Sequence, residues 1–458
     1  MPEGSSPLSM SKLNQTIESG HVDTVLVVFT DMQGRLAGKR VHARYFMDEV
    51  RDHGMEGCNY LLAVDVEMNT VTGYDISSWE QGYGDFMFKP DLSTLRAAPW
   101  LPGSVMVQCD LLWLDGTPVR QSPRQVLRAQ VDEATALGVE PFGATELEFL
   151  VFNGTYQDAF DADYRGLRGS TRYNVDYSIL GTSGDEPLIR DIRNTMYNAG
   201  LTVESSKGEC NFGQHEIAFK YDRVLTTADN HVVFKTAAKE LAERHGKSLT
   251  FMAKYDEREG NSCHIHMSLR GVDGSMVFAD DGRGEYFDGR SATFKSFVAG
   301  VQATLRDFTL LYAPTINSYK RYQDGSFAPT AIAWGEDNRT CALRVIGTGA
   351  GLRVENRVPG GDVNPYLAQA AMLAGGLFGI RAGLPLEEAF VGNAYASDLA
   401  RVPSTLREAR DIFNDSELAK TAFGEDVVKH YVRAADVELE AFDGTVTDWE
   451  RRRGFERF

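Results

Sequence analysis

Residues 339–366 read RTCALRVIGTGAGLRVENRVPGGDVNPY, a stretch rich in arginine around short apolar runs. Side chains two positions apart in an extended chain point to the same face, so Arg353, Glu355 and Arg357 would share one face of a strand. A carboxylate between two guanidinium groups is costly to bury unless each charge meets a partner. Taken alone, the triplet could equally be an edge strand with a solvated charged face.

Two other runs of the chain repeat the two-residue spacing. PFGATELEFLVF places Glu146 and Glu148 on one face of an apolar run, a pattern typical of a buried strand. GNSCHIHMSL places His264 and His266 on one face in the same way. A single histidine among apolar residues is usually a core histidine. A carboxylate pair, a histidine pair and a carboxylate between arginines together indicate one assembled site.

The stretch between these runs, ESSKGECNFGQHEIAF over residues 204–219, adds Glu209 and Glu216. Carboxylates with an imidazole suit hard divalent cations such as Mg²⁺ or Mn²⁺ better than they suit a thiolate-bound zinc site. Arginines nearby suit phosphate oxygens, because the planar guanidinium group can bind them in a bidentate manner. Metal ligands beside phosphate ligands predict nucleotide chemistry.

Composition limits the classes of function. The 458 residues carry a formal net charge of −18, which argues against nucleic acid or an anionic membrane as the main partner. The five cysteines are scattered without a CxxC pair, which favours reduced thiols and a cytoplasmic location. Residues 1–18 lack the features of a signal peptide, so we expect a disordered tip there. The apolar run 366–380 contains Gln369 and is too short to span a bilayer, which predicts a buried helix.

The N-terminal part has the pattern of a small α+β domain. Residues 23–41 alternate apolar and polar side chains around a turn near Gly34, which predicts a hairpin. Further strands are expected near residues 60–66 and 105–112. We therefore predict an N-terminal domain over residues 19–117.

A second domain follows a turn at residues 115–118, DGTP. The sequence SPR after it is typical of a helix start, and we expect a helix over residues 124–137. Beyond it, the strands that bear the charged motifs alternate with amphipathic helices, one of them over residues 227–245. These patterns predict a catalytic domain over residues 118–458.

Seven motifs in order along the chain are TELEF, GECNFGQHE, GNSCHIH, APTINSYKR, WGEDNRTCALR, RVENR and NPYLAQAAMLAGG. Together they resemble the class I type of the glutamine synthetase superfamily, from about residue 22 to the C-terminus. The resemblance implies an α+β fold with an N-terminal β-grasp domain and a catalytic domain built from a curved antiparallel sheet backed by helices. It also implies a homo-oligomer, a dodecamer of two hexameric rings, with each active site shared between neighbouring subunits.

The resemblance implies roles for individual residues, with two or three Mg²⁺ or Mn²⁺ ions and one ATP in each active site. The metal nearer the glutamate would be held by Glu148, Glu209 and Glu216, and the metal on the nucleotide phosphates by Glu146, His264 and Glu355. ATP would contact Glu204, Tyr221, His266, Ser268, Arg339 and Arg344. L-Glutamate would contact Gly260, Asn261, His266, Arg321 and Arg357. The residues implied in catalysis are Arg339, Glu355 and Phe327, the last on a flap.

The implied chemistry has two steps. The γ-carboxylate of L-glutamate attacks the γ-phosphate of ATP and gives γ-glutamyl phosphate and ADP. A nitrogen nucleophile then displaces phosphate and forms an amide. Phosphorylation supplies a good leaving group, and the metals neutralise charge that would repel the nucleophile.

The chain departs from glutamine synthetases where the nucleophile would bind. Their DGSS motif is missing from the corresponding stretch, TGYDISSWEQGYGD, over residues 72–85. Phe327 stands where their flap carries a glutamate. Ammonium needs carboxylates to bind it and a base to remove its proton, and a phenyl ring supplies neither. Alternatively, Phe327 merely packs the flap, and Asp75 or Glu80 supplies the carboxylate.

These departures resemble the γ-glutamylpolyamine and γ-glutamylethanolamide synthetases of amine utilisation. We therefore predict a glutamate–amine ligase, with ethanolamine as the favoured amine. A polyamine would need acidic residues along a channel, and the candidates are Glu67, Asp75, Glu80 and Asp324. An ammonium-using glutamine synthetase is the second hypothesis. An inactive paralogue acting as a nitrogen sensor is the third, although all six metal-ligand positions are filled.

Overall fold

The computed structural model describes residues 8–279 and 289–458. Its N-terminal part is one mixed sheet in the order β2-β1-β6-β4-β3, with β5 paired to β6. The strands are β1 (Thr24–Thr30), β2 (Leu36–His42), β3 (Met55–Cys58), β4 (Asp85–Pro90), β5 (Arg96–Ala97) and β6 (Ser104–Leu112). β1 runs antiparallel to β2 and parallel to β6, the mixed pairing of a β-grasp-like sheet.

The larger sheet has ten strands, in the order β14-β15-β16-β13-β7-β10-β9, with β8, β11 and β12 also paired to β7. Its strands are β7 (Val139–Asn153), β8 (Arg168–Gly169), β9 (Val203–Gly208), β10 (Gln214–Phe219), β11 (Asp222–Arg223), β12 (Lys247–Thr250), β13 (Cys263–Gly271), β14 (Trp334–Glu336), β15 (Leu343–Ile346) and β16 (Arg353–Asn356). All pairings except β14 with β15 are antiparallel.

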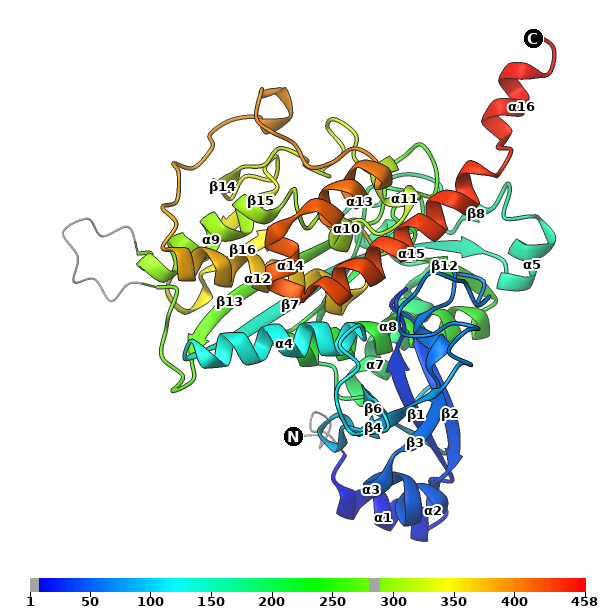
Figure 1. The fold of residues 1–458 in the computed structure, drawn as a ribbon. Helices are drawn as coiled ribbons and strands as arrows, with labels where there is room; N and C mark the ends of the chain where they lie inside the picture. The colour runs from blue at the N-terminus through cyan, green and yellow to red at the C-terminus, as the bar shows by residue number, and fades with distance from the viewer. Residues whose placement is uncertain (1–7, 280–288) are drawn as a thin grey trace.

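The α-helices flank both sheets. They are α1 (Met10–Glu18), α2 (Ala43–Tyr45), α3 (Arg51–His53), α4 (Pro123–Ala136), α5 (Tyr156–Asp161), α6 (Ile179–Thr182), α7 (Glu186–Asn198), α8 (Val224–Arg244), α9 (Ala292–Thr304), α10 (Thr309–Tyr312), α11 (Ile316–Lys320), α12 (Pro365–Ala382), α13 (Leu406–Asp415), α14 (Glu417–Phe423), α15 (Glu425–Asp443) and α16 (Asp448–Gly454). Figure 1 shows the N-terminal sheet below the larger one, with α4 and α8 near the junction and α16 projecting away from the body. The predicted α+β class, with helices backing a large, mostly antiparallel sheet, is confirmed.

Helix α12 is the buried helix expected from the apolar run 366–380. It packs against α9 at very short range, because glycines lie where the two helices cross. A Cβ atom on Gly379 would lie 2.0 Å from the carbonyl oxygen of Ser296, and one on Gly300 would lie 2.2 Å from that of Gly375. This close contact fixes the layer of helices behind the sheet.

The expectation of a disordered tip over residues 1–18 is wrong for its second half. Helix α1 begins after Ser9, whose side chain accepts a hydrogen bond from the backbone N–H of Lys12. Leu13 and Ile17 lie on one face of the helix, four residues apart, and are buried in the main core. Residues 1–7 lie outside the described part of the chain.

The hairpin expected over residues 23–41 is confirmed as β1 and β2. Asp31 holds its turn, because its carboxylate accepts hydrogen bonds from the backbone N–H groups of Gln33 and Arg35. The strand expected near residues 60–66 is wrong: the chain curls there into a 3₁₀ turn. Asn59 holds that curl, since its side-chain amide donates to the carbonyl oxygen of Ile76, 17 residues away.

A buried guanidinium group joins the two parts of the chain. Arg124, at the start of α4, contacts Asp91 and Asp110 from the N-terminal part, and Asp229 from α8, at 2.6 to 3.0 Å. The hydroxyl group of Tyr366 also donates to Asp229, at 2.6 Å. We keep the domain division proposed between residues 117 and 118, which falls between β6 and α4. Within the described residues, no helix is long and apolar enough to cross a membrane.

Candidate active site

Strand register brings the charged motifs together. Glu148 of β7 lies opposite Glu216 of β10, and Glu146 lies opposite His264 of β13. The next pairing places His266 opposite Glu355 of β16. Two-residue periodicity therefore predicted the shared faces, and the antiparallel pairing of the four neighbouring strands β10, β7, β13 and β16 joins those faces into one site.

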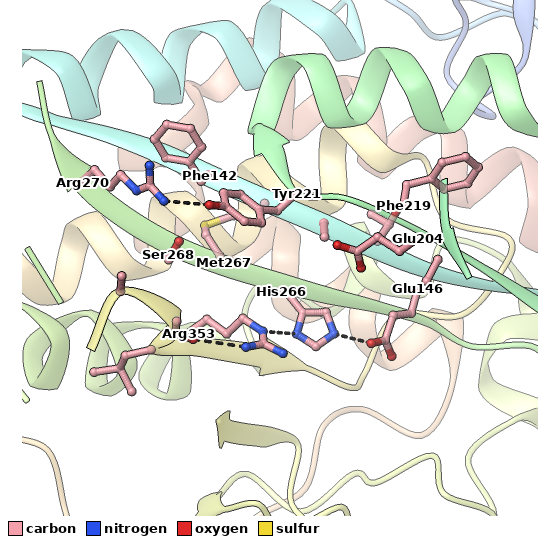
Figure 2. Close-up of a pocket in the computed structure, with 17 residues that line it drawn as sticks. Phe142, Glu146, Glu204, Phe219, Tyr221, His266, Met267, Ser268, Arg270 and Arg353 are labelled. Carbon is pink, nitrogen blue, oxygen red and sulfur yellow. Dashed lines mark hydrogen bonds and ion pairs between the residues drawn. The ribbon is translucent and has the colours of Figure 1, made fainter. Parts of the chain in front are cut away.

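The first cluster consists of Glu146, His266 and Glu355, whose donor atoms lie within 4.8 Å of one another. The Nε2 atom of His266 is 2.9 Å from Glu146, and its Nδ1 atom accepts a hydrogen bond from Arg353 at 3.3 Å (Figure 2). His264 is nearby as well, with Nδ1 at 3.4 Å from both carboxylates. The structure thus places both histidines beside Glu146 and Glu355, whereas the resemblance implied a ligand role for His264 alone.

Positive charge balances this first cluster. Glu355 is fully buried, and its two oxygens contact Arg344 at 2.9 Å and Arg357 at 2.6 Å. Burial opposes ionisation, but His264 and Arg357 together hold the pKa of Glu355 below its usual value. Burial and the neighbouring Arg357 lower the pKa of His264 to about 4, so this imidazole is neutral at pH 7. A neutral imidazole can offer its lone pair to a metal.

The second cluster consists of Glu148, Glu209 and Glu216, again with oxygens within 4.8 Å of one another. Burial, followed by the charge of Glu209, raises the pKa of Glu148 to about 7. Burial, with Glu146 and Glu148 close by, raises the pKa of Glu216 to about 9. Three carboxylates in one buried place repel one another, and a divalent cation would remove that repulsion.

The donor set fits hard divalent cations. All the oxygens come from carboxylates, and the accompanying nitrogens come from imidazoles, which suits Mg²⁺ or Mn²⁺. The Nε2 atom of His264 is buried and has no hydrogen-bond partner among the described residues, as expected of an atom reserved for a ligand. Either cluster could therefore hold a metal ion.

Two adjoining cavities share Glu146. The acidic cavity, of about 340 Å³, is lined by the members of both clusters except His266 and Glu355, and Phe327 lines it as well. Predicted site residues that line it are Glu146, Glu148, Glu209, Glu216, Gly260, His264, Phe327, Arg339, Arg344 and Arg357. The Tyr221 cavity, of about 250 Å³, is drawn in Figure 2. Predicted site residues that line it are Glu146, Glu204, Tyr221, His266 and Ser268.

Two residues predicted to bind glutamate line neither cavity. Arg321 is only 2% exposed, and its guanidinium group donates to the carbonyl oxygens of Arg357 and Val358 and to Ser262. Asn261 is fully buried, and its side chain is bonded to Gln214 and to backbone carbonyl groups. In this structure both residues lie behind the acidic cavity, where they hydrogen-bond to its lining residues Ser262 and Gln214.

Sequence reasoning assigned no role to three residues that reach the cavities. Arg353 holds His266 and lines the Tyr221 cavity, and it was visible in RVENR as the first member of the charged triplet. Lys207 forms an ion pair with Glu209 and lies 3.8 Å from Asp176. Its position two residues before Glu209 is the same signal that revealed the other pairs. Tyr177 lies under the Lys207 ammonium group, 4.6 Å from ring centre to nitrogen, and carried no comparable signal.

We expect Glu216→Gln to stabilise the metal-free protein in a pH-dependent way. A carboxyl group with a pKa of about 9 when folded and 4.5 when unfolded contributes its full stabilisation below pH 4.5. The contribution is lost as the pH rises to 9, because the unfolded chain releases a proton that the folded chain retains. The variant's gain in unfolding free energy should grow from near zero at pH 4.5 to more than about 2 kcal/mol at pH 9. Urea unfolding in EDTA measures it.

In saturating Mn²⁺ the wild type should instead have the higher free energy of unfolding, because Glu216→Gln lacks one of the carboxylates that would hold the ion. Glu456→Gln, at an exposed position near the C-terminus, controls for the loss of one charge. A gain that is the same at every pH would show that Glu216 is not coupled to the cluster.

Comparison with known proteins agrees with this geometry. The sequence profile of the glutamine synthetase catalytic domain matches residues 120–454. A γ-glutamylethanolamide synthetase, GlnA4, of Streptomyces coelicolor is 59% identical over 451 residues, 98% of this chain and 96% of the relative. A glutamate–isopropylamine ligase of a Pseudomonas species is 37% identical over 447 residues, 96% of this chain and 97% of the relative. A solved structure, described as apo GmaS without ligand, superposes with a TM-score of 0.85 at 27% identity, covering 98% of this chain and all of the other. The chain belongs to the glutamine synthetase family.

Proposed function

We propose that this enzyme joins a small monoamine, ethanolamine in the first place, to the γ-carboxylate of L-glutamate, with ATP as the energy source and γ-glutamyl phosphate as the intermediate. The observation that carries the proposal is Phe327, a largely exposed aromatic side chain that lines a cavity of mainly charged residues. The relatives named for γ-glutamylethanolamide synthesis and for isopropylamine ligation support an amine as the nucleophile.

Two divalent ions, Mg²⁺ or Mn²⁺, would lower the charge of the reacting phosphate and carboxylate groups when bound. Glu148, Glu209 and Glu216 would hold one of them. Glu146 and Glu355, with His264 or His266, would hold the other. The protein itself fixes most of these ligands by placing them on strands of one sheet, whereas Glu209 lies in the loop that follows β9.

Arginines would steady the phosphoryl group during transfer. Arg344 is held at 2.8 Å by Asp337 and at 2.9 Å by Glu355, so its guanidinium group is oriented before a substrate arrives. Arg339 is half exposed at the mouth of the acidic cavity, 3.9 Å from Asp337, and is free to turn toward a phosphate. Arg357 faces the same cavity from beneath Phe327 and would meet a substrate carboxylate.

The amine would enter between two aromatic side chains. Phe327 and Tyr177 line the acidic cavity, are 56% and 72% exposed, and both have a φ of 55°. Bulky residues seldom adopt this left-handed conformation, and such strain is concentrated at ligand sites. An alkyl group that they cover gains about 0.8 kcal/mol for each CH₂ removed from water, a term that ammonium cannot gain.

Lys207 favours a singly charged amine over a diamine or a polyamine. Its ammonium group lies in the acidic cavity with Glu209, Asp176 and the ring of Tyr177. Burial opposes its protonation, but Glu209 keeps the pKa of Lys207 well above the ordinary value. A second ammonium group on the substrate would meet this cation. The acidic candidates for a polyamine channel, Glu67, Asp75, Glu80 and Asp324, do not line the cavity within one chain.

We also propose the dodecamer of two hexameric rings. The loop that replaces the DGSS motif carries Trp79, which is 71% exposed in the single chain. In a ring this loop would be available to an active site of the neighbouring subunit.

Phosphate release with ATP, Mg²⁺ and L-glutamate tests the function directly. We expect turnover with ethanolamine and isopropylamine, far less with putrescine or spermidine, and little with ammonium, with each product identified by mass. Turnover mainly with ammonium would instead identify a glutamine synthetase. Silence with every nucleophile would favour an inactive sensor.

Phe327→Glu should move the preference toward ammonium. The carboxylate would bind ammonium and accept its proton, while the apolar surface for an alkyl chain is lost. We expect the ratio of kcat/KM for ammonium to that for ethanolamine to rise by about tenfold or more, an effect of about 1.4 kcal/mol. Phe327→Leu, which keeps an apolar side chain, is the matched control. An unchanged ratio in the Glu variant would remove Phe327 from the amine site.

Lys207→Met should raise diamine use. Removing the ammonium group takes away the repulsion of a second cation, so kcat/KM for putrescine should rise relative to that for ethanolamine. Lys207→Arg keeps the charge and should keep the discrimination. Mn²⁺ binding, followed by electron paramagnetic resonance, shows whether the metal ligands survive the change. If both variants discriminate as the wild type does, the repulsion argument is wrong.

A further inference from the structure

A third cavity, lined mainly by positive charge, lies beside the acidic one. It has a volume of about 700 Å³, and four cationic side chains, Arg168, Arg172, Lys247 and Arg258, line it together with Asp185 and Asp256. We call it the basic cavity. Its walls are the end of β7, the short strand β8, the start of β12 and two loops, residues 211–212 and 255–258.

Both carboxylates of the basic cavity are already engaged. Asp185 is 2% exposed, and contacts His215 at 2.9 Å, Ser170 at 2.5 Å and Lys247 at 3.2 Å. Asp256 contacts Arg258 at 3.0 Å and accepts a hydrogen bond from Asn211 at 3.2 Å.

The remaining cations have no such counterpart. Arg168 and Arg172 are exposed to solvent at the edge of the cavity, and across the part of the chain that the structure describes their side chains form no ion pair or hydrogen bond. The chain as a whole carries a net charge of −18, so a cavity lined by four cations and two carboxylates has the opposite sign of charge. Two guanidinium groups that face a cavity without a protein partner point to an anion from outside.

We propose that the basic cavity binds a small organic anion with two or more carboxylate or phosphate groups. Guanidinium groups match both kinds of oxygen pair in a bidentate manner. Arg258 is already oriented, since its guanidinium carbon lies 4.1 Å from the centre of the Phe212 ring. The volume suits a metabolite, within the range typical of small-molecule sites.

The basic cavity and the acidic cavity share two loops of the chain. One loop contributes Glu209 and Cys210 to the acidic cavity and Asn211 and Phe212 to the basic cavity. A second loop divides in the same way, with Asp256 and Arg258 on the basic side and Glu259 and Gly260 on the acidic side. The side chain of Asn211 ties the two loops together, donating to the Glu259 carbonyl oxygen at 2.7 Å.

An anion that draws Arg258 away from Asp256 would therefore move Asp256 and its hydrogen-bond partner Asn211. Glu209 and Glu259 would move with Asn211, because they lie on the two loops that it joins. The site would act as an effector site for the metal and substrate cavity. Binding of the anion does not depend on the proposed function, whereas its effect on turnover rests on that function.

Calorimetric titration of the metal-free, full-length protein with glutarate and, separately, with pyrophosphate tests the site. We expect Arg168→Gln/Arg172→Gln to lose one bound anion per chain, or to bind it at least about tenfold more weakly, since charge-assisted hydrogen bonds are lost. Binding of glutarate alone assigns a carboxylate ligand, binding of pyrophosphate alone a phosphate ligand, and binding of both the shared anion chemistry.

A matched control removes two positive charges elsewhere. Arg190→Gln/Arg452→Gln changes two exposed arginines outside the basic cavity and should bind as the wild type does. Three results overturn the proposal: no binding by the wild type, equal binding by the cavity variant, or an equal loss in the control. The last would mean attraction by net charge alone. Thermal melting of each variant confirms that it is folded.

The effect on turnover separates this inference from the proposed function. In the ethanolamine assay, the bound anion should shift the apparent KM for glutamate or Mg²⁺ in the wild type but not in the cavity variant. Anion binding by an enzyme that turns over no amine would leave the site standing and the proposed function refuted. Amine turnover without anion binding would support the proposed function and refute the anion site.

Discussion

The mutual repulsion of five buried or half-buried glutamates is the constraint on which the site depends. Strand pairing forces them together, so each must find a counter-charge or keep its proton. Glu355 has a counter-charge within the protein, because Arg344 and Arg357 form ion pairs with its two oxygens. Around Glu216 the protein holds only Lys207 and a retained proton. The second cluster is therefore the part of the site that most needs a metal ion.

Two-residue periodicity predicted much of this site because β-strands convert sequence spacing directly into a shared face. Glu146 with Glu148 and His264 with His266 could be read in this way. The position of Arg321 could not, since its guanidinium group is held by the carbonyl oxygens of Arg357 and Val358, which follow β16 and lie 36 and 37 residues further along the chain. Which histidine meets Glu146 most closely depends on the stagger between β7 and β13, which side-chain alternation does not determine. Helix α1 was missed because only two apolar residues anchor it.

The residues of the site stand partly on strands and partly on loops, and the two groups have different proposed roles. Most of the groups that would bind metal and phosphate stand on the paired strands β7, β10, β13, β15 and β16, where hydrogen bonding fixes their positions, whereas Glu209 and Arg339 lie in loops. The aromatic groups that would meet the amine, Phe327 and Tyr177, stand on connecting segments, both at a strained φ. A different amine can thus be accommodated by changing a loop while the phosphoryl-transfer geometry stays as it is. The identity of the amine is accordingly the property that strand patterns reveal least.

The ion pairs of Arg124 with three aspartates have a consequence for fragments of the chain. Two of those carboxylates, Asp91 and Asp110, come from one side of the proposed domain boundary, and the guanidinium group comes from the other. A fragment ending at residue 117 would expose two aspartates without their cation. A fragment starting at residue 118 would keep a buried arginine with Asp229 as its sole acidic partner of the three. Neither fragment would therefore keep the charge balance that this contact has in the whole chain.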